Sequence, residues 1–177
     1  LLDAHMHVES GMVTLTEFVR AVGPRGTTGM FVDPHEIANV FGLKGVRLMV
    51  DEAALQPVNV WVQMPSCVPS APGLETPGAT IGPDEVREAM TWPGIIGLGE
   101  VMNFPAVFGS EPNMHAEIAE TMRAGRTVGG HFAALEHHHI QRALIAYDRD
   151  PAGDRAALDL AEALKARGVA AYRVELP

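Results

Sequence analysis

Along the first three quarters of the chain, apolar and polar positions alternate between two patterns, short apolar runs and segments of helical periodicity. Short apolar runs predict strands near Leu1–Met6, Thr28–Val32, Val58–Gln63, Ile95–Leu98 and Thr127–Gly130. Helical periodicity between these runs predicts helices over Thr14–Val22, Leu43–Leu55, Asp84–Met90 and Met114–Ala124, with Thr14 or Thr16 as the first N-cap. Alternating strands and helices are typical of repeated βα units around a parallel sheet.

A proline-rich segment follows the third expected strand. Five of the 13 prolines lie between Pro65 and Pro83, together with three glycines. Proline lacks the N–H that a helix or an inner strand needs, so we expect a structured loop here. Loops that follow strands of a barrel commonly carry substrate contacts.

The pattern changes beyond about residue 132. Residues 133–177 predict a strand, an acidic turn, an amphipathic helix closed by Gly168 and a second strand, at Gln141–Tyr147, Asp148–Gly153, Asp154–Arg167 and Val169–Leu176. We therefore expect two domains, a larger α/β domain over 1–132 and a βαβ segment over 133–177.

Composition narrows the classes of function. Thirteen Lys and Arg against 22 Asp and Glu give a net charge of −9, which argues against a general binder of nucleic acid or anionic membrane. The single Cys67 excludes an internal disulfide framework and a cysteine-cluster zinc site, and favours a cytoplasmic protein. No apolar run approaches the roughly 20 residues of a membrane span.

The first expected strand ends in His5-Met6-His7. Residues i and i+2 of a strand point to the same side, so the two imidazoles can share one metal ion. Two surface histidines would be the ordinary interpretation of an isolated His-x-His. Here the position at a strand end and the neighbouring Asp3 and Glu9 favour a metal site.

Three further strand ends carry similar groups. Glu100 follows the apolar run Ile95–Gly99, and His131 follows Thr127–Gly130. The segment Asp33-Pro34-His35-Glu36 follows the second strand and is either a third donor group or the capping segment of a helix. Imidazole and carboxylate without thiolate indicate a hard or borderline divalent metal, and hydrolysis by metal-activated water is the reaction class that follows.

Four blocks of sequence resemble the adenine deaminase branch of the amidohydrolase superfamily. They run Asp3–Ser10, Asp33–Val40, Met64–Pro69 and Gly97–Pro105, and the resemblance covers about residues 1–132. It implies a (β/α)8 barrel, of which about five βα units are present, and hydrolysis of adenine to hypoxanthine and ammonia. It also implies a divalent metal, with manganese or iron expected and zinc as an alternative.

The resemblance assigns roles to individual residues. His5, His7, Glu100 and His131 match the metal ligands, with Glu100 as the bridging and catalytic carboxylate. The remaining blocks match loops that contact substrate or metal, which gives four substrate-binding candidates: His35, Glu36, Ser66 and Asn103.

The resemblance also implies parts that this sequence lacks, namely a sixth-strand His, a late-barrel Asp and a flanking β domain. We therefore expect a truncated form, and a homo-oligomer or another chain is one way to complete it. A non-catalytic metal-binding fragment is the main alternative.

The acidic turn offers a second interpretation. The segment from Ala143 to Ala157 resembles the Asp-x-Asp part of Toprim domains in primase-type nucleic-acid enzymes, which implies Mg²⁺ at Asp148 and Asp150. The upstream glutamate motif of that family is absent. A plain βαβ unit with a helix-capping aspartate fits equally well.

Overall fold

The structure is a computed structural model that describes residues 1–130, 142–145, 151–166, 168 and 170–173. The chain divides into two compact units, Leu1–His131 and Phe132–Pro177. Among the described residues, no helix combines the length and apolar composition that crossing a membrane requires. The cytoplasmic location expected from composition stays a prediction.

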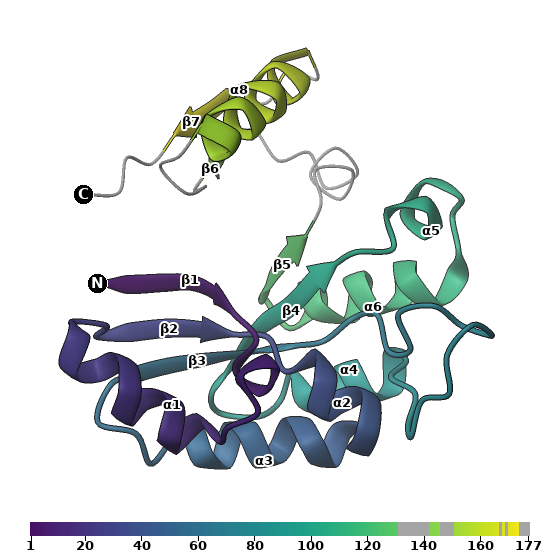
Figure 1. The fold of residues 1–177 in the computed structure, drawn as a ribbon. Helices are drawn as coiled ribbons and strands as arrows, with labels where there is room; N and C mark the ends of the chain where they lie inside the picture. Colours follow the sequence, from purple (N-terminus) through teal and green to yellow (C-terminus); the bar gives the residue numbers. More distant parts are fainter. Residues whose placement is uncertain (131–141, 146–150, 167, 169, 174–177) are drawn as a thin grey trace. The chain divides into compact units, whose positions relative to one another are not determined.

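The first unit is built on one parallel sheet whose strand order follows the sequence (Figure 1). Its strands are β1 (Leu2–Met6), β2 (Gly29–Val32), β3 (Asn59–Met64), β4 (Ile95–Val101) and β5 (Thr127–Gly130). All five expected strands are thus confirmed. Strand β4 extends to Val101, so Glu100 is the second-last residue of the strand and does not follow it.

Four expected helices are confirmed, at α1 (Leu15–Val22), α3 (Leu43–Ala53), α4 (Pro83–Ala89) and α6 (Pro112–Arg123). The Thr14 side chain accepts a hydrogen bond from the Glu17 N–H, so Thr14 is the N-cap of α1. Helices α1, α3 and α4 lie along one face of the sheet (Figure 1), and α6 packs against α4, β4 and β5.

Helix α2 (His35–Phe41) begins within the segment that was expected either to supply a donor group or to cap a helix. The pattern did not predict the short helix α5 (Phe104–Phe108), nor the 3₁₀ turns η1 (Val8–Gly11) and η2 (Gly23–Arg25). Elements of three to five residues contain too few turns to show a helical period. Helix α2 matters for function because it starts directly after Pro34 and positions His35 and Glu36 at its first turn.

The core lies between the sheet and the helices. Alternate strand residues are fully buried, among them Met30 and Val32 on β2 and Val62 and Met64 on β3. They join buried helix residues such as Val46 in one apolar cluster. Five parallel strands with helices on one face form part of a (β/α)8 barrel, as expected.

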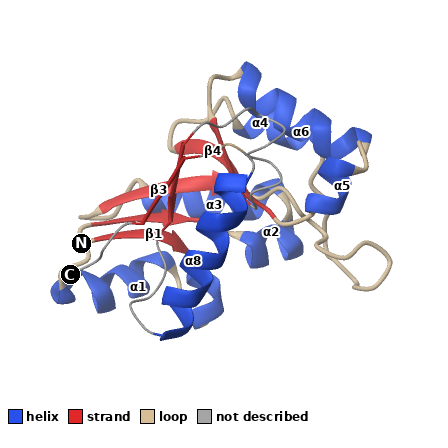
Figure 2. Cartoon of the chain, turned by 90° about the horizontal axis from the view of Figure 1, so that it is seen from above, coloured by secondary structure: helices blue, strands red, loops and turns tan. Residues whose placement is uncertain are grey.

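The second unit contains β6 (Arg142–Ile145), α8 (Pro151–Ala166) and β7 (Ala170–Arg173). Strands β6 and β7 pair in parallel, so the expected βαβ unit is confirmed. Helix α8, which Figure 2 shows in blue, starts three residues before the expected start, at Pro151. Proline suits the first helical position because its missing N–H would have no intrahelical partner there.

An ion-pair network joins α4 to α6. Arg87 on α4 donates to Glu120 on α6 at 3.0 Å and to Asp84 at 2.6 Å, and Arg123 also donates to Glu120. The hydrogen bond from Arg87, followed by that from Arg123, lowers the pKa of Glu120 to about 2. The charged form of Glu120 therefore stabilises the packing of the two helices.

We expect the substitution Glu120→Gln to lower the melting temperature at pH 7. The pKa of Glu120 lies below its ordinary value in the folded state, so its contribution is present above about pH 4.5 and disappears as the pH falls toward 2. Thermal melts at pH 7 and pH 2.5 measure this. The exposed Glu88 on α4 supplies the control Glu88→Gln, which should leave both melts unchanged. An equal loss in Glu120→Gln at both pH values would contradict the assignment.

Candidate metal centre and adjoining cavity

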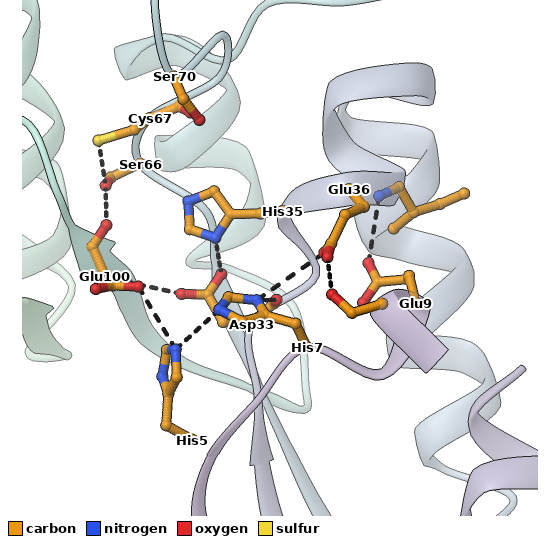
Figure 3. A network of polar contacts seen from close by, with 12 residues as sticks. His5, His7, Glu9, Asp33, His35, Glu36, Ser66, Cys67, Ser70 and Glu100 are labelled. Atoms are coloured by element: carbon orange, nitrogen blue, oxygen red, sulfur yellow. Dashed lines mark hydrogen bonds and ion pairs between the residues drawn. The ribbon is translucent and has the colours of Figure 1, made fainter. Parts of the chain in front are cut away.

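The carboxyl ends of β1, β2 and β4 meet at one edge of the sheet, and three predicted ligands converge there (Figure 3). His5 Nε2 lies 3.0 Å from His7 Nε2 and 3.5 Å from Glu100 Oε2. Ligand atoms of these three residues all lie within 4.8 Å of one another.

A backbone contact orients His7. Its Nδ1 lies 2.7 Å from the carbonyl oxygen of Asp33. A carbonyl can only accept, so Nδ1 carries the hydrogen and Nε2 presents its lone pair toward His5 and Glu100. Metal-binding histidines are commonly oriented by a hydrogen bond of this kind.

The three donors fit a divalent cation. A cation about 2.0–2.2 Å from each nitrogen or carboxylate oxygen would hold its donors roughly 3.0–3.5 Å apart, which is close to the spacing observed. Two imidazoles and a carboxylate suit zinc, manganese or iron better than a soft metal.

Asp33 lies at the centre of this arrangement, although it was not among the predicted ligands. Its side chain is fully buried. Oδ2 accepts a hydrogen bond from the Glu100 N–H at 2.8 Å, and Oδ1 lies 2.8 Å from Nδ1 of His35. A buried carboxylate is costly unless such partners compensate it, so Asp33 ties the end of β2 to β4 and to α2.

Gly99 makes the approach of Asp33 possible. A Cβ on Gly99 would lie 2.4 Å from Asp33 Oδ2, which is far below a van der Waals contact. The register of β4 against β5 also shifts between Leu98 and Glu100. The Glu100 N–H, which donates to Asp33, lies at this irregularity of the strand.

His35 is the fourth predicted residue that joins the cluster. Burial disfavours its charged form, but the contact with Asp33 and the negative charges of Glu100 and Glu36 outweigh burial, so the pKa of His35 is raised. His7, Asp33 and His35 also offer ligand atoms within 4.8 Å of one another. A divalent cation bound beside His35 would act in the opposite direction and favour the neutral ring.

Two glutamates connect this cluster to η1 and α2. Glu36 accepts a hydrogen bond from the Ser10 hydroxyl, and its Oε2 lies 4.0 Å from Nδ1 of His7. Glu9 Oε1 accepts from the Ile37 N–H at 3.2 Å in the first turn of α2. Burial raises the pKa of Glu9 above its ordinary value.

Ser66 and Asn103 lie beside the cluster rather than within it. The Ser66 hydroxyl donates to the Glu100 carbonyl at 2.8 Å, and Asn103 caps α5 by accepting from the Ala106 N–H. Both residues line a cavity of about 290 Å³. Their roles as substrate contacts stay predictions.

Three predicted site residues, His131, Asp148 and Asp150, lie outside the described residues. Sequence reasoning named the segment containing Asp33 but did not select this residue, and it missed Glu117, a buried cavity-lining glutamate. The signal for Asp33 was its position at a strand end, whereas a single glutamate on an amphipathic helix gives no signal of burial.

Comparison with known proteins assigns the class. The sequence profile described as the Amidohydrolase family matches residues 1–171. The chain therefore belongs to the amidohydrolase family, and this membership implies a divalent metal.

Relatives of this chain carry the name adenine deaminase. The chain is 70% identical over 134 residues to "Adenine deaminase 1" of Jannaschia sp. (strain CCS1), covering 76% of this chain and 23% of that protein. It is 54% identical over 173 residues to "Adenine deaminase" of Paracoccus denitrificans (strain Pd 1222), covering 98% and 28%. The chain thus spans about a quarter of the length of these curated relatives.

The second of these alignments also bears on residues 133–177. It extends well into this segment, as does the family profile. The Toprim-like interpretation has no comparable match among these comparisons and stays a prediction.

We expect Gly99→Ala to lower the free energy of unfolding by about 1–3 kcal/mol, because the added methyl group would displace the Asp33 carboxylate. Urea denaturation measures the loss. Gly23→Ala is the matched control, since Gly23 has a helical backbone and a Cβ there would meet no atom within 4 Å. Equal stability of the two variants would contradict the close packing of Asp33 on Gly99.

We expect the double variant His5→Ala, His7→Ala to bind less divalent metal than the wild-type chain. Two of the three converging ligands are then removed. Metal content after loading with Mn²⁺ and desalting measures this by elemental analysis. His115→Ala serves as control, because His115 Nε2 bonds the Val107 carbonyl on α5. Equal metal in all three proteins would rule out the site.

Proposed function

We propose that this chain carries the metal-binding part of a hydrolytic deaminase that converts adenine and water to hypoxanthine and ammonia. The convergence of His5, His7 and Glu100 at the carboxyl edge of a parallel sheet is the observation that supports it most directly. The printed names of the relatives supply the substrate.

His5 and His7 would hold the metal through their Nε2 atoms, with Glu100 as the carboxylate ligand. His131, which lies outside the described residues, is the further ligand that the resemblance implies. Manganese or iron suits this donor set, and zinc is the alternative. A bound divalent cation lowers the pKa of water toward neutrality and so supplies hydroxide for the attack.

The reaction adds the water oxygen to C6 of adenine and breaks the bond from C6 to the exocyclic nitrogen, which leaves as ammonia with the transferred protons. We assign this proton transfer to Glu100, because its Oε2 lies 3.5 Å from Nε2 of His5, one of the proposed metal ligands. Its N–H is held by Asp33, which keeps the carboxylate in position.

Four residues would contact the purine. His35 and Glu36 stand at the first turn of α2, and Ser66 and Asn103 line the adjoining cavity. A homo-oligomer or a second chain would supply further groups around the site.

We expect the purified chain to release ammonia from adenine when Mn²⁺ is added. Glu100→Gln should lower the rate at least about a hundredfold, because it removes a proton-transfer group and an anionic ligand. A coupled ammonia assay across a range of protein concentrations measures this and reveals any dependence on oligomerisation. Bound metal without ammonia release at any concentration would contradict deamination by this chain and support the non-catalytic metal-binding alternative.

A further inference from the structure

The cavity beside the metal centre has mostly apolar walls and a few polar groups. It lies between the loop that follows β3, the end of β4 and the N-terminal half of α6. Val68, Pro72 and Ile81 form part of its apolar wall, and Ser66 and Asn113 belong to its polar lining. Its volume of about 290 Å³ is close to the lower end of the range for small-molecule sites.

One residue that lines the cavity, Glu117, has a buried carboxyl oxygen without a hydrogen-bond partner among the described residues. Glu117 lies on the inner side of α6 and is only 3% exposed. Its Oε2 is buried and makes no hydrogen bond to any residue that the structure describes. An unpartnered buried polar atom costs free energy, so a carboxyl group lining a cavity indicates a partner from outside the chain.

The charged groups around Glu117 are acidic or already paired. Burial, followed by the negative charges of Glu111 and Glu85, raises the pKa of Glu117 to about 8. The one cation on α4, Arg87, is bonded to Asp84 and Glu120.

On α6 itself, Arg123 is bonded to Glu120, and His115 bonds the Val107 carbonyl. Glu111 also lines the cavity, and its carboxylate accepts a hydrogen bond from the Met114 N–H at 2.7 Å. Cys67 is the remaining titratable group of the cavity wall, and its Sγ lies 3.3 Å from the Ser66 hydroxyl oxygen. Glu117 is therefore protonated and neutral at pH 7.

A neutral carboxyl group offers one donor and one acceptor side by side. This pair matches the N–C–NH₂ edge of a cyclic amidine and the N–C=O edge of a cyclic amide. A cation would find no counter-charge on Glu117, and the apolar walls suit a planar ring better than a hydrated ion.

We propose that this cavity binds a small planar cyclic amidine or amide whose edge pairs with the carboxyl group of Glu117. The identity of the ligand as adenine rests on the proposed function. Ser66 connects the two sites, since it lines the cavity and its hydroxyl donates to the Glu100 carbonyl. Glu117 would thus select the heterocycle next to the groups that bind the metal.

Calorimetric titration of the full chain with adenine, with metal removed by chelator, tests this binding directly. Glu117→Leu should weaken binding about tenfold or more, because it removes both hydrogen bonds. Glu117→Gln should bind at pH 7, because an amide also carries a donor and an acceptor. Glu88→Gln is the matched control on an exposed glutamate and should bind as the wild type does.

The pH profile provides a second readout. Wild-type binding should weaken as the pH rises through about 8, where Glu117 loses its proton, whereas Glu117→Gln should show no such change up to pH 9. Melting curves check that each variant folds. If Glu117→Leu does not fold, the pH profiles of the wild type and Glu117→Gln decide the result.

Several results would overturn the proposal. These are equal adenine affinity in Glu117→Leu and the wild type, no adenine binding by the wild type, identical pH profiles with glutamine at 117, and displacement of adenine by millimolar NH₄⁺ or K⁺. The variant His5→Ala, His7→Ala should lose metal and ammonia release but keep adenine binding. Failure of deamination is thereby distinguished from failure of this site.

Discussion

The buried carboxylate of Asp33 is the group on which the described site depends. It is fully buried, accepts the Glu100 N–H and lies 2.8 Å from His35, while its own carbonyl oxygen orients His7. Removing a charge from water is costly, so the contacts of the Asp33 carboxylate compensate its burial. The close approach requires glycine at position 99 and a local shift in the register of β4. Asp33 therefore couples the end of β2 to β4 and α2 through its carboxylate, and to His7 after β1 through its backbone carbonyl.

The same edge of the sheet provides two chemically different environments. His5, His7 and Glu100 offer two imidazoles and a carboxylate, and a divalent cation would neutralise the negative charge of the carboxylate. The adjoining cavity is mostly apolar, and burial keeps its carboxyl group, Glu117, neutral at pH 7. Ser66 lies between them and contacts the backbone of Glu100. A charged centre next to a mostly apolar cavity suits the activation of water beside a flat heterocycle.

The positions of the strands could be predicted because apolar periodicity is a local property, and the ends of parallel strands share one edge of a sheet. The same reasoning predicts that His5, His7 and Glu100 lie close together, as the structure shows. The sequence left open whether Asp33–Glu36 supplies a donor group or caps a helix, so the contact of His35 with Asp33 could not be predicted. Asn103 illustrates the converse, since its side chain caps α5, a role that the resemblance did not indicate.

The sequence by itself determined the class of fold and the donor types, because both follow from residue identity and spacing along single strands. It also determined the family, through long ordered blocks that match known relatives. Only the tertiary structure decided that Asp33 is buried against Gly99, that the Nε2 atoms of His5 and His7 face each other and that Glu117 lines a cavity. The contact of Asp33 with Gly99 joins residues far apart in the chain, and the direction of the two imidazoles depends on the carbonyl of Asp33, which contacts His7. Burial changes the free energy of a charged group, and the local sequence pattern does not reveal it.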